Sequence, residues 1–296
     1  MKNISFFSYK GGSGRTSILY NTIPFLVKEL GATETEPIIL MDLDIDSKGL
    51  SYLLAEKSKI NTIQILKGCD YVNTINRNMS IQEHPFFKNL SPVGCLFGLE
   101  PKDNKSVLFV SAHHNNDDDR FINGNSNFDD SNISLSLLNR LCEFYKCKAI
   151  VMDTPAGNQL ACDVSLSISQ TIVTVMRITK QFREGTYEFL KTKSQRFNNK
   201  SFIIVPNAVP NAQNTIYSIE KIMESIKRSC LDCVNTNNYL NLKMIDSNGI
   251  NEVQQFKFEE KVLFEEKNLR KLSQDEENAI AKYEFLATEI VNNANL

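Results

Sequence analysis

The sequence of 296 residues lacks the features that mark several large classes of protein. No run of about 18 apolar residues occurs, so we expect no membrane-spanning helix. The first residues contain no long apolar segment that ends in small residues, so we expect no secretory signal. The chain also shows no internal repeat and no linker-like composition, so nothing in the sequence divides it.

An excess of charge of either sign is also missing. Lysine plus arginine number 33 and aspartate plus glutamate number 35, which gives a formal net charge of −2. This balance disfavours a generic nucleic-acid coat protein, although a local basic face stays open. The seven cysteines are an odd number and are scattered, which favours reduced thiols over a disulfide framework. We therefore expect a cytoplasmic protein.

What is present is the composition of a globular protein, with 42% hydrophobic and 23% charged residues. A chain of this length buries about 75% of its unfolded surface without needing disulfides or metal. Short apolar runs predict strands, several of them as continuous as buried parallel strands are. The runs are Ile4–Ser8, Ile38–Asp42, Val107–Ser111, Ala149–Asp153, Ile172–Met176 and Phe202–Val205.

Amphipathic stretches separate and follow these runs, at 19–30, 135–145 and 279–291. Alternation of strands and helices predicts an α/β fold with a doubly wound, mostly parallel sheet and helices on both faces. We expect a single domain spanning 1–296. Residues 84–132 break the alternation with prolines, glycines and a polar tract, so we expect a polar insertion or exposed loop there. Pro24 lies inside the first helical stretch and should kink it.

The most informative segment follows the first expected strand and reads Lys10-Gly-Gly-Ser-Gly-Arg-Thr-Ser17. Glycines after a strand let successive backbone N–H groups point inward, and the N-terminus of the following helix adds positive potential. The segment therefore predicts a phosphate-binding loop. The hydroxyl of Thr16 is placed to ligate Mg²⁺ bound to phosphates, whereas Arg15 occupies the position where a lysine is usual.

Carboxylates follow two of the expected strands. Asp42 and Asp44 end the second strand, and alternation along a strand would aim both side chains to the same side. Asp153 ends a later strand and precedes a loop that contains Pro155 and Gly157. Because ligands bind at the carboxyl ends of parallel strands, these carboxylates are candidate magnesium ligands.

Together these segments resemble the ParA/MinD family of deviant Walker-A P-loop ATPases. The family's loop K-G-G-x-G-K-[ST] matches Lys10–Thr16 with one departure, and its aspartate-x-aspartate matches Asp42-Leu43-Asp44. Its D-[ST]-P-[AP]-G segment matches Asp153–Gly157, and its strand that ends in an adenine-reading asparagine matches Phe202–Asn207. The order of these matches holds across about residues 1–210.

The resemblance implies a role for each matched residue. Lys10 would reach across a two-fold interface to the partner's phosphates and Asp44 would orient the attacking water, so both would be catalytic. Thr16, Asp42 and Asp153 would hold Mg²⁺. ATP would be bound by Lys10, Gly11, Gly12, Ser13, Gly14, Arg15, Thr16, Ser17 and Asn207, with Asn207 on adenine.

The resemblance thus implies an ATP- and Mg²⁺-dependent dimerising switch that hydrolyses ATP slowly and positions or regulates an unidentified protein partner. One alternative is a degenerate scaffold that binds nucleotide without turnover, because of Arg15. A second is a metal-cluster carrier using Cys230 and Cys233, and a third is a small-molecule kinase. Basic residues at 180–200 and 221–228 keep non-specific DNA open as a partner, with a solvated helix face as the simpler interpretation.

Overall fold

A computed structural model describes residues 2–54, 62, 90–92, 103–112, 142–157, 160–193, 196, 199–209, 219–234, 242–244, 250–251 and 274–294. The chain forms two compact units. Unit 1 comprises residues 1–5 and 30–169, and unit 2 comprises residues 6–29 and 170–296. The strand order within unit 1 is β3-β4-β2-β5, and within unit 2 it is β6-β7-β8 with β9 beside β7.

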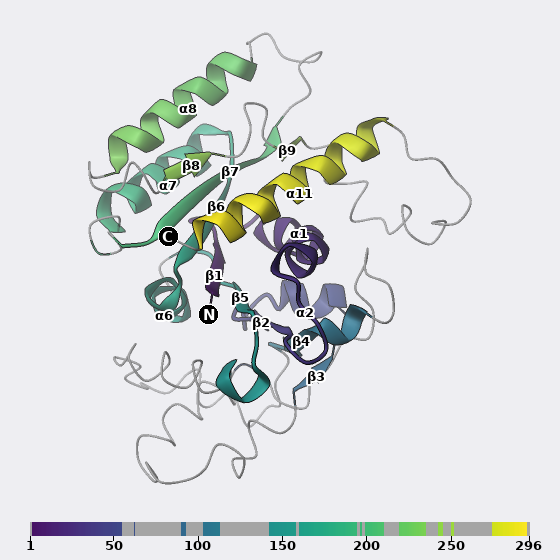
Figure 1. The fold of residues 1–296 in the computed structure, drawn as a ribbon. Helices are drawn as coiled ribbons and strands as arrows, with labels where there is room; N and C mark the ends of the chain where they lie inside the picture. Colours follow the sequence, from purple (N-terminus) through teal and green to yellow (C-terminus); the bar gives the residue numbers. More distant parts are fainter. Residues whose placement is uncertain are drawn as a thin grey trace. The chain divides into compact units, whose positions relative to one another are not determined.

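Unit 1 is built around parallel strands. β2 pairs in parallel with β4 and with β5, and β3 pairs antiparallel with β4. The strands are β1 (Lys2–Phe7), β2 (Ile38–Asp42), β3 (Ser91–Pro92), β4 (Val107–Val110) and β5 (Ala149–Asp153). The helices are α2 (Gly49–Leu54), η3 (Asp103–Ser106) and α6 (Leu160–Ile168) (Figure 1).

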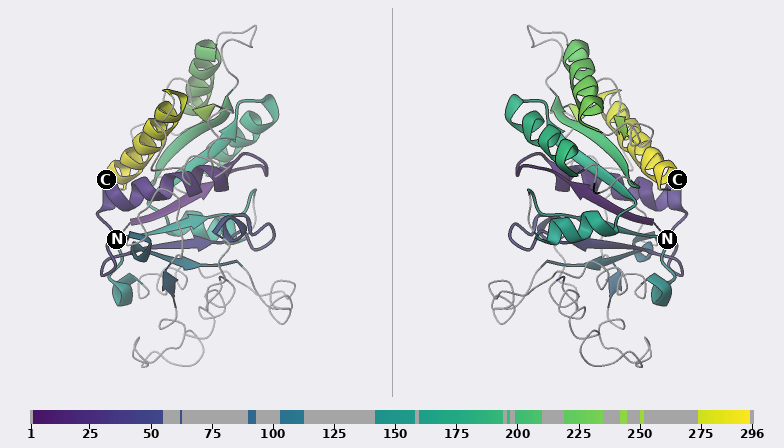
Figure 2. Two further views of the ribbon diagram at one scale, coloured as in Figure 1. Left: turned by 90° about the vertical axis from the view of Figure 1, so that its right-hand side faces the viewer. Right: turned by 90° about the vertical axis from the view of Figure 1, so that its left-hand side faces the viewer.

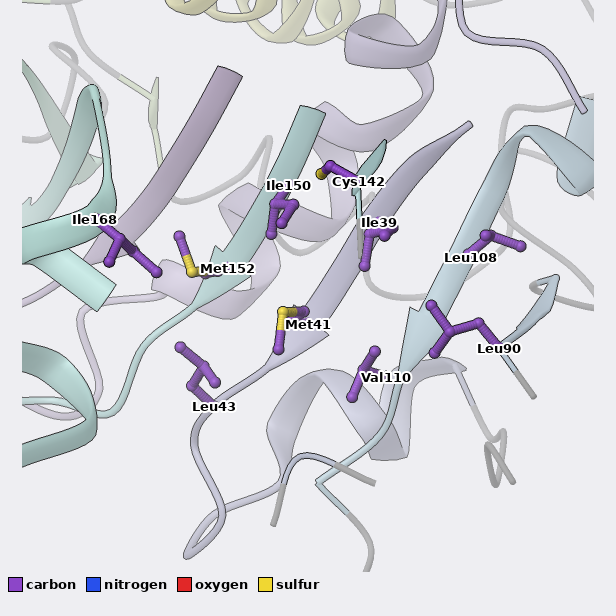
Figure 3. Packing of buried hydrophobic residues seen from close by; sticks show 10 residues of the cluster. All are labelled: Ile39, Met41, Leu43, Leu90, Leu108, Val110, Cys142, Ile150, Met152 and Ile168. Carbon is purple, nitrogen blue, oxygen red and sulfur yellow. The ribbon is translucent and has the colours of Figure 1, made fainter. Parts of the chain in front are cut away.

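The core of unit 1 explains why its strands read as continuous apolar runs. Every residue of β2 and β5 is buried, so side chains on both faces of these strands are removed from water. One face carries the cluster shown in Figure 3, whose members come from the strands and the residues next to them, the helical turn 142–145 and the end of α6. The cluster contains Ile39, Met41, Leu43, Leu90, Leu108, Val110, Cys142, Ile150, Met152 and Ile168.

The helical turn before β5 ends in a Schellman motif. The N–H of Cys147 donates to the carbonyl of Cys142 at 3.0 Å, and the N–H of Lys146 donates to the carbonyl of Glu143 at 3.3 Å. Lys146 takes the left-handed conformation that this motif needs, with φ 51°. The motif brings Cys142 and Cys147 together, and they form a disulfide. The expectation of reduced thiols is therefore wrong for this pair.

Unit 2 is also a parallel arrangement, with β7 paired to β6, β8 and β9. Its strands are β6 (Thr171–Arg177), β7 (Ser201–Val209), β8 (Leu242–Met244) and β9 (Ile250–Asn251). Its helices are α1 (Arg15–Leu30), α7 (Lys180–Lys193), α8 (Ile219–Cys233) and α11 (Gln274–Asn293). α7 and α11 lie on opposite sides of β6 (Figure 2), and α1 is joined to α11 by the Lys28–Glu284 ion pair at 2.8 Å.

These elements confirm the expected fold class and all the expected strands, which differ from the prediction by a few residues at their ends. α1 continues through Pro24 to Leu30. Of the region 84–132, residues 90–92 and 103–112 form β3, η3 and β4, so this part is not a loop; the remainder, including the polar tract, lies outside the described residues. No helix in the described part of the chain is long and apolar enough to cross a bilayer. A single domain over 1–296 stays a prediction.

Candidate functional site

The phosphate loop (Lys10–Ser17) connects β1 to α1 in unit 2. Gly12 and Gly14 have φ of 78° and 85°, a region that residues with a side chain rarely enter. A Cβ added to Gly11 or Gly12 would meet no atom within 4 Å, so both glycines face open space. α1 begins at Arg15 and has no acidic residue in its first turn. The positive end of the helix is therefore not neutralised by a carboxylate of its own first turn, and such an end favours an anion such as phosphate.

The two cations of the phosphate loop contact other side chains of unit 2. The Lys10 ammonium nitrogen lies 5.8 Å from the centre of the Phe182 ring, which comes from α7. Arg15 is buried, and its Nη1 donates to the hydroxyl of Ser8 at 3.4 Å. Sequence reasoning missed both of these partners. Phe182 lies about 170 residues away in the chain, and no local pattern marks it.

Asn207 connects β7 to the phosphate loop. Its Nδ2 donates to the backbone carbonyl of Ser13 at 2.7 Å, and its side chain is fully buried. Its Oδ1 has no hydrogen-bond partner among the described residues. Ala208, the next residue, has φ 51°, and the pairing register between β7 and β9 shifts at this point. The structure therefore brings Asn207 to the phosphate loop.

The carboxylate edge (Asp42, Asp44 and Asp153) lies in unit 1. Asp42 and Asp153 are register partners at the ends of β2 and β5, and both are fully buried. Ser51 of α2 donates to Asp42 Oδ2 twice, from its backbone N–H at 2.9 Å and its hydroxyl at 2.7 Å. The N–H of Asp44 donates to Asp42 Oδ1 at 3.1 Å. These donors fix the orientation of the Asp42 carboxylate.

Burial has an electrostatic consequence for this edge. Desolvation, followed by the charge of Asp153, raises the pKa of Asp42 to about 7, and the hydrogen bonds from Ser51 and Asp44 oppose this shift. Two buried carboxylates in register repel each other, so a cation or a proton between them is favoured. Ser51 was missed because α2 is only six residues long and carries no clear periodic pattern.

Asp44 lies outside the strand. β2 ends at Asp42, so alternation along a strand does not extend to Asp44. The Asp44 carboxylate instead accepts the N–H of Ser47 at 3.2 Å, and its backbone carbonyl accepts the N–H of Lys48 at 2.7 Å. Asp44 thus shapes the turn that leads into α2. The prediction that Asp42 and Asp44 alternate along one strand is therefore wrong for Asp44.

The remaining candidates are the two cysteines that the sequence offers as metal ligands. Cys230 and Cys233 are free cysteines on α8, and burial raises the pKa of Cys230 to about 12, which keeps its thiol protonated. No group of three or more His, Cys, Asp or Glu side chains in the described ranges could hold a metal ion by itself. The structure therefore adds nothing to the cysteine pair that would favour a metal cluster.

Comparison with known proteins gives structural neighbours only, since no protein-family model matches the chain and no curated protein matches it. A ParA family ATPase from Chlorobium tepidum has a TM-score of 0.59 and 15% identity, covering 96% of this chain and 99% of that one. MinD in the MinC:MinD complex of Aquifex aeolicus has a TM-score of 0.57 and 15% identity, with coverage of 97% and 96%. MinD from Pyrococcus horikoshii, complexed with Mg-ADP, has a TM-score of 0.56 and 13% identity, with coverage of 99% and 98%. The chain has the fold of the ParA/MinD ATPases.

Proposed function

We propose that this chain, which has the ParA/MinD fold, is an ATP-dependent dimerising switch that positions or regulates a protein partner and hydrolyses ATP slowly. The observation that carries the proposal is the phosphate loop with Asn207 bound to it. Gly12 and Gly14 turn the loop before the N-terminus of α1, which has no acidic residue in its first turn, and Asn207 ties the loop to β7. Phosphate transfer needs this kind of positioning and charge neutralisation more than it needs a reactive side chain.

The hydrogen bonds of Asn207 favour adenine as the base. One hydrogen of its amide nitrogen is donated to the Ser13 carbonyl, which fixes the side chain, and its Oδ1, an acceptor, has no partner among the described residues. Adenine presents an amino group that donates, whereas guanine presents a carbonyl oxygen at the same position. An acceptor without a partner would bind the first and repel the second, so ATP is the proposed nucleotide.

Magnesium fits the residues of the carboxylate edge. Asp42 and Asp153 are hard oxygen ligands in register with each other, and a divalent cation would offset the repulsion that raises the pKa of Asp42. Magnesium usually keeps several waters and binds through only one or two carboxylates and the phosphates, so an all-protein cage is not required. We propose Asp42, Asp153 and Thr16 as the groups that hold it, with Asp44 orienting the attacking water.

Dimerisation depends on Lys10 in this proposal. If Lys10 reaches the phosphates bound to a second copy, the negative charge of those phosphates is neutralised only in the dimer. ATP therefore holds the two copies together, and hydrolysis releases them. The neighbour in the MinC:MinD complex supports a protein partner for the switch. DNA is a further candidate partner because α7 carries Lys191 and Lys193 in its last turn.

A scaffold that binds ATP without turnover is the second candidate, and Arg15 favours it. A guanidinium is a fixed planar fork, and here it is buried beside Ser8, whereas the usual lysine is a compact charge that can follow a moving phosphate. Phosphate release from purified protein separates the two candidates. Release above the rate of an Asp44→Asn variant supports the ATPase, and equal rates support the scaffold.

Sedimentation velocity with and without ATP tests the switch itself. We expect ATP to convert monomer into dimer in the wild type, and Lys10→Ala to abolish the conversion while ATP still binds. Lys105→Ala serves as the control, since this lysine is more than half exposed and pairs with Glu34. A protein that is dimeric to the same degree with and without ATP contradicts the proposal.

A further inference from the structure

The chain that enters the phosphate loop packs against α7. A Cβ added to Gly185 would overlap Cδ1 of Tyr9, so the ring would have to move. The Tyr9 hydroxyl also donates to Glu188 Oε2 at 3.4 Å. Glycine inside a helix costs about 1 kcal/mol relative to alanine, and the Tyr9 ring occupies the room that the missing side chain leaves.

The same face of α7 reaches the residues on either side of Tyr9. The Phe7 and Phe189 rings have centroids 4.2 Å apart, and Phe182 lies under the Lys10 ammonium nitrogen at 5.8 Å. Phe182, Gly185 and Phe189 are spaced three and four residues apart, so they share one face of the helix. One face of α7 thus contacts three residues of the segment 7–10. The position of Lys10 therefore depends on its packing against α7.

We propose that α7 holds Lys10 in a parked position in the nucleotide-free chain. Phe182 binds the ammonium group through the face of its ring, and Tyr9 with Gly185 fixes the backbone beside it. The inference rests on the proposed role of Lys10 in dimerisation. One ammonium group serves both contacts, so the parked contact competes with the reach of Lys10 to a second copy, and Phe182 sets part of the threshold for assembly.

Lys10 and Phe182 are both partly exposed, so the value for an exposed contact gives the lower bound of the expected effect. An exposed cation–π contact is worth about 0.5–1 kcal/mol, which corresponds to a two- to fivefold change in an equilibrium constant. A symmetric dimer breaks the contact twice, once in each copy. Removing it should therefore strengthen the dimer by about five- to thirtyfold.

The parked contact is first tested without nucleotide, so that its outcome is independent of the proposed function. In the full chain labelled with ¹³C-lysine, the Lys10 ε-methylene signal is the one absent from Lys10→Arg. An aromatic face shields protons above it, so we expect this signal upfield in the wild type and in Phe182→Tyr, and at the ordinary lysine position in Phe182→Leu. An ordinary position in the wild type overturns the parked contact.

Sedimentation in saturating ATP then measures the competition. Phe182→Leu keeps an apolar side chain without a ring, and we expect its dimer dissociation constant to fall about five- to thirtyfold. Phe182→Tyr keeps the ring and should match the wild type. An unchanged or raised dissociation constant in Phe182→Leu overturns the competition. A wild type that neither binds ATP nor dimerises overturns the proposed function and with it the competition, whatever the lysine spectrum shows.

Gly185→Ala provides a second variant that favours the helix and displaces the Tyr9 ring. The added methyl group forces the ring away from α7, so the backbone beside Lys10 loses its support. We expect the Lys10 signal to move towards the ordinary position and the dimer to strengthen, with ATP affinity measured in parallel. A Lys10 signal that stays shielded in both Gly185→Ala and Phe182→Leu contradicts the proposal.

Discussion

The carboxylate edge of unit 1 and the phosphate loop of unit 2 differ in how their charged groups are held. Asp42 is fully buried and accepts from Ser51 and from the N–H of Asp44, so its orientation is set before any ligand arrives. The loop instead has exposed glycines, and the Lys10 ammonium lies against an aromatic ring that it can leave. Substitutions in the edge should therefore change chemistry and stability, and substitutions in the loop should change affinity and assembly.

The largest expected effect concerns Asp44, at the carboxylate edge. Asp44→Asn keeps an oxygen that can accept the N–H of Ser47, so the turn before α2 should survive. Loss of the group that orients water should slow hydrolysis by about 10²–10⁴-fold and leave ATP bound in a persistent dimer. Single-turnover hydrolysis and sedimentation measure this, with the exposed Asp46→Asn as a matched control. Lost ATP affinity in Asp44→Asn would show that the role is misassigned.

At the carboxylate edge, Asp42 should make the free energy of unfolding depend on pH. Its pKa is raised to about 7, so ionisation costs stability, which is present at acid pH and lost as the pH rises from about 4 to 7. The side-chain amide that Asp42→Asn introduces does not ionise. The free energy of unfolding of the variant, relative to that of the wild type, should therefore rise by a few kcal/mol between pH 5 and pH 8, at about 1.4 kcal/mol per pKa unit. Urea unfolding without magnesium measures both proteins. A constant difference across this range contradicts the burial argument.

Substitution of Asn207, which contacts the phosphate loop, should change the affinity for nucleotide. Asn207→Ala removes the donor to the Ser13 carbonyl and the acceptor proposed for adenine, so ATP binding should weaken by about 1–3 kcal/mol. The preference for ATP over GTP should narrow, while hydrolysis at saturation should change less. Isothermal titration with both nucleotides measures this, with the exposed Asn199→Ala as control. An unchanged preference would remove Asn207 from base recognition.

Arg15 gives a smaller effect, on turnover. Lysine and arginine attract phosphate similarly, and they differ in shape. Because only interactions that strengthen in the transition state raise the rate, we expect Arg15→Lys to change ATP affinity little and to raise turnover about tenfold, or 1.4 kcal/mol. A slower variant would instead show that the surroundings of the buried Arg15 side chain, including Ser8, are adapted to arginine.

The smallest expected effect concerns the backbone beside Asn207. Ala208 has φ 51°, a conformation that costs a residue with a side chain about 1–2 kcal/mol and costs glycine much less. Ala208→Gly should therefore raise the free energy of unfolding by about 1 kcal/mol, as measured by thermal melting. Ala32→Gly, at a position without positive φ, should give no gain. Equal effects in the two variants would show that Ala208 is not strained.

The fold and the backbone of the site were predictable because they depend on local patterns. Continuous apolar runs predicted β2, β5 and β7, and the glycines of residues 11–14 predicted the loop. The contacts of Ser51 with Asp42 and of Phe182 with Lys10 were not predictable, because they join residues with no shared period or motif. The Cys142–Cys147 disulfide was missed because it depends on a left-handed residue at a helix end, which lysine rarely supplies.

The division of the chain between the two units has a consequence for genetics. Unit 2 takes residues 6–29 and 170–296, so the loop and β7, which carries Asn207, come from two separate segments of the gene. A stop codon after residue 169 would leave α1 and the loop without β6 and β7. Truncations that end between residues 30 and 169 should therefore unfold unit 2, so a genetic screen that separates nucleotide binding, hydrolysis and assembly needs point substitutions.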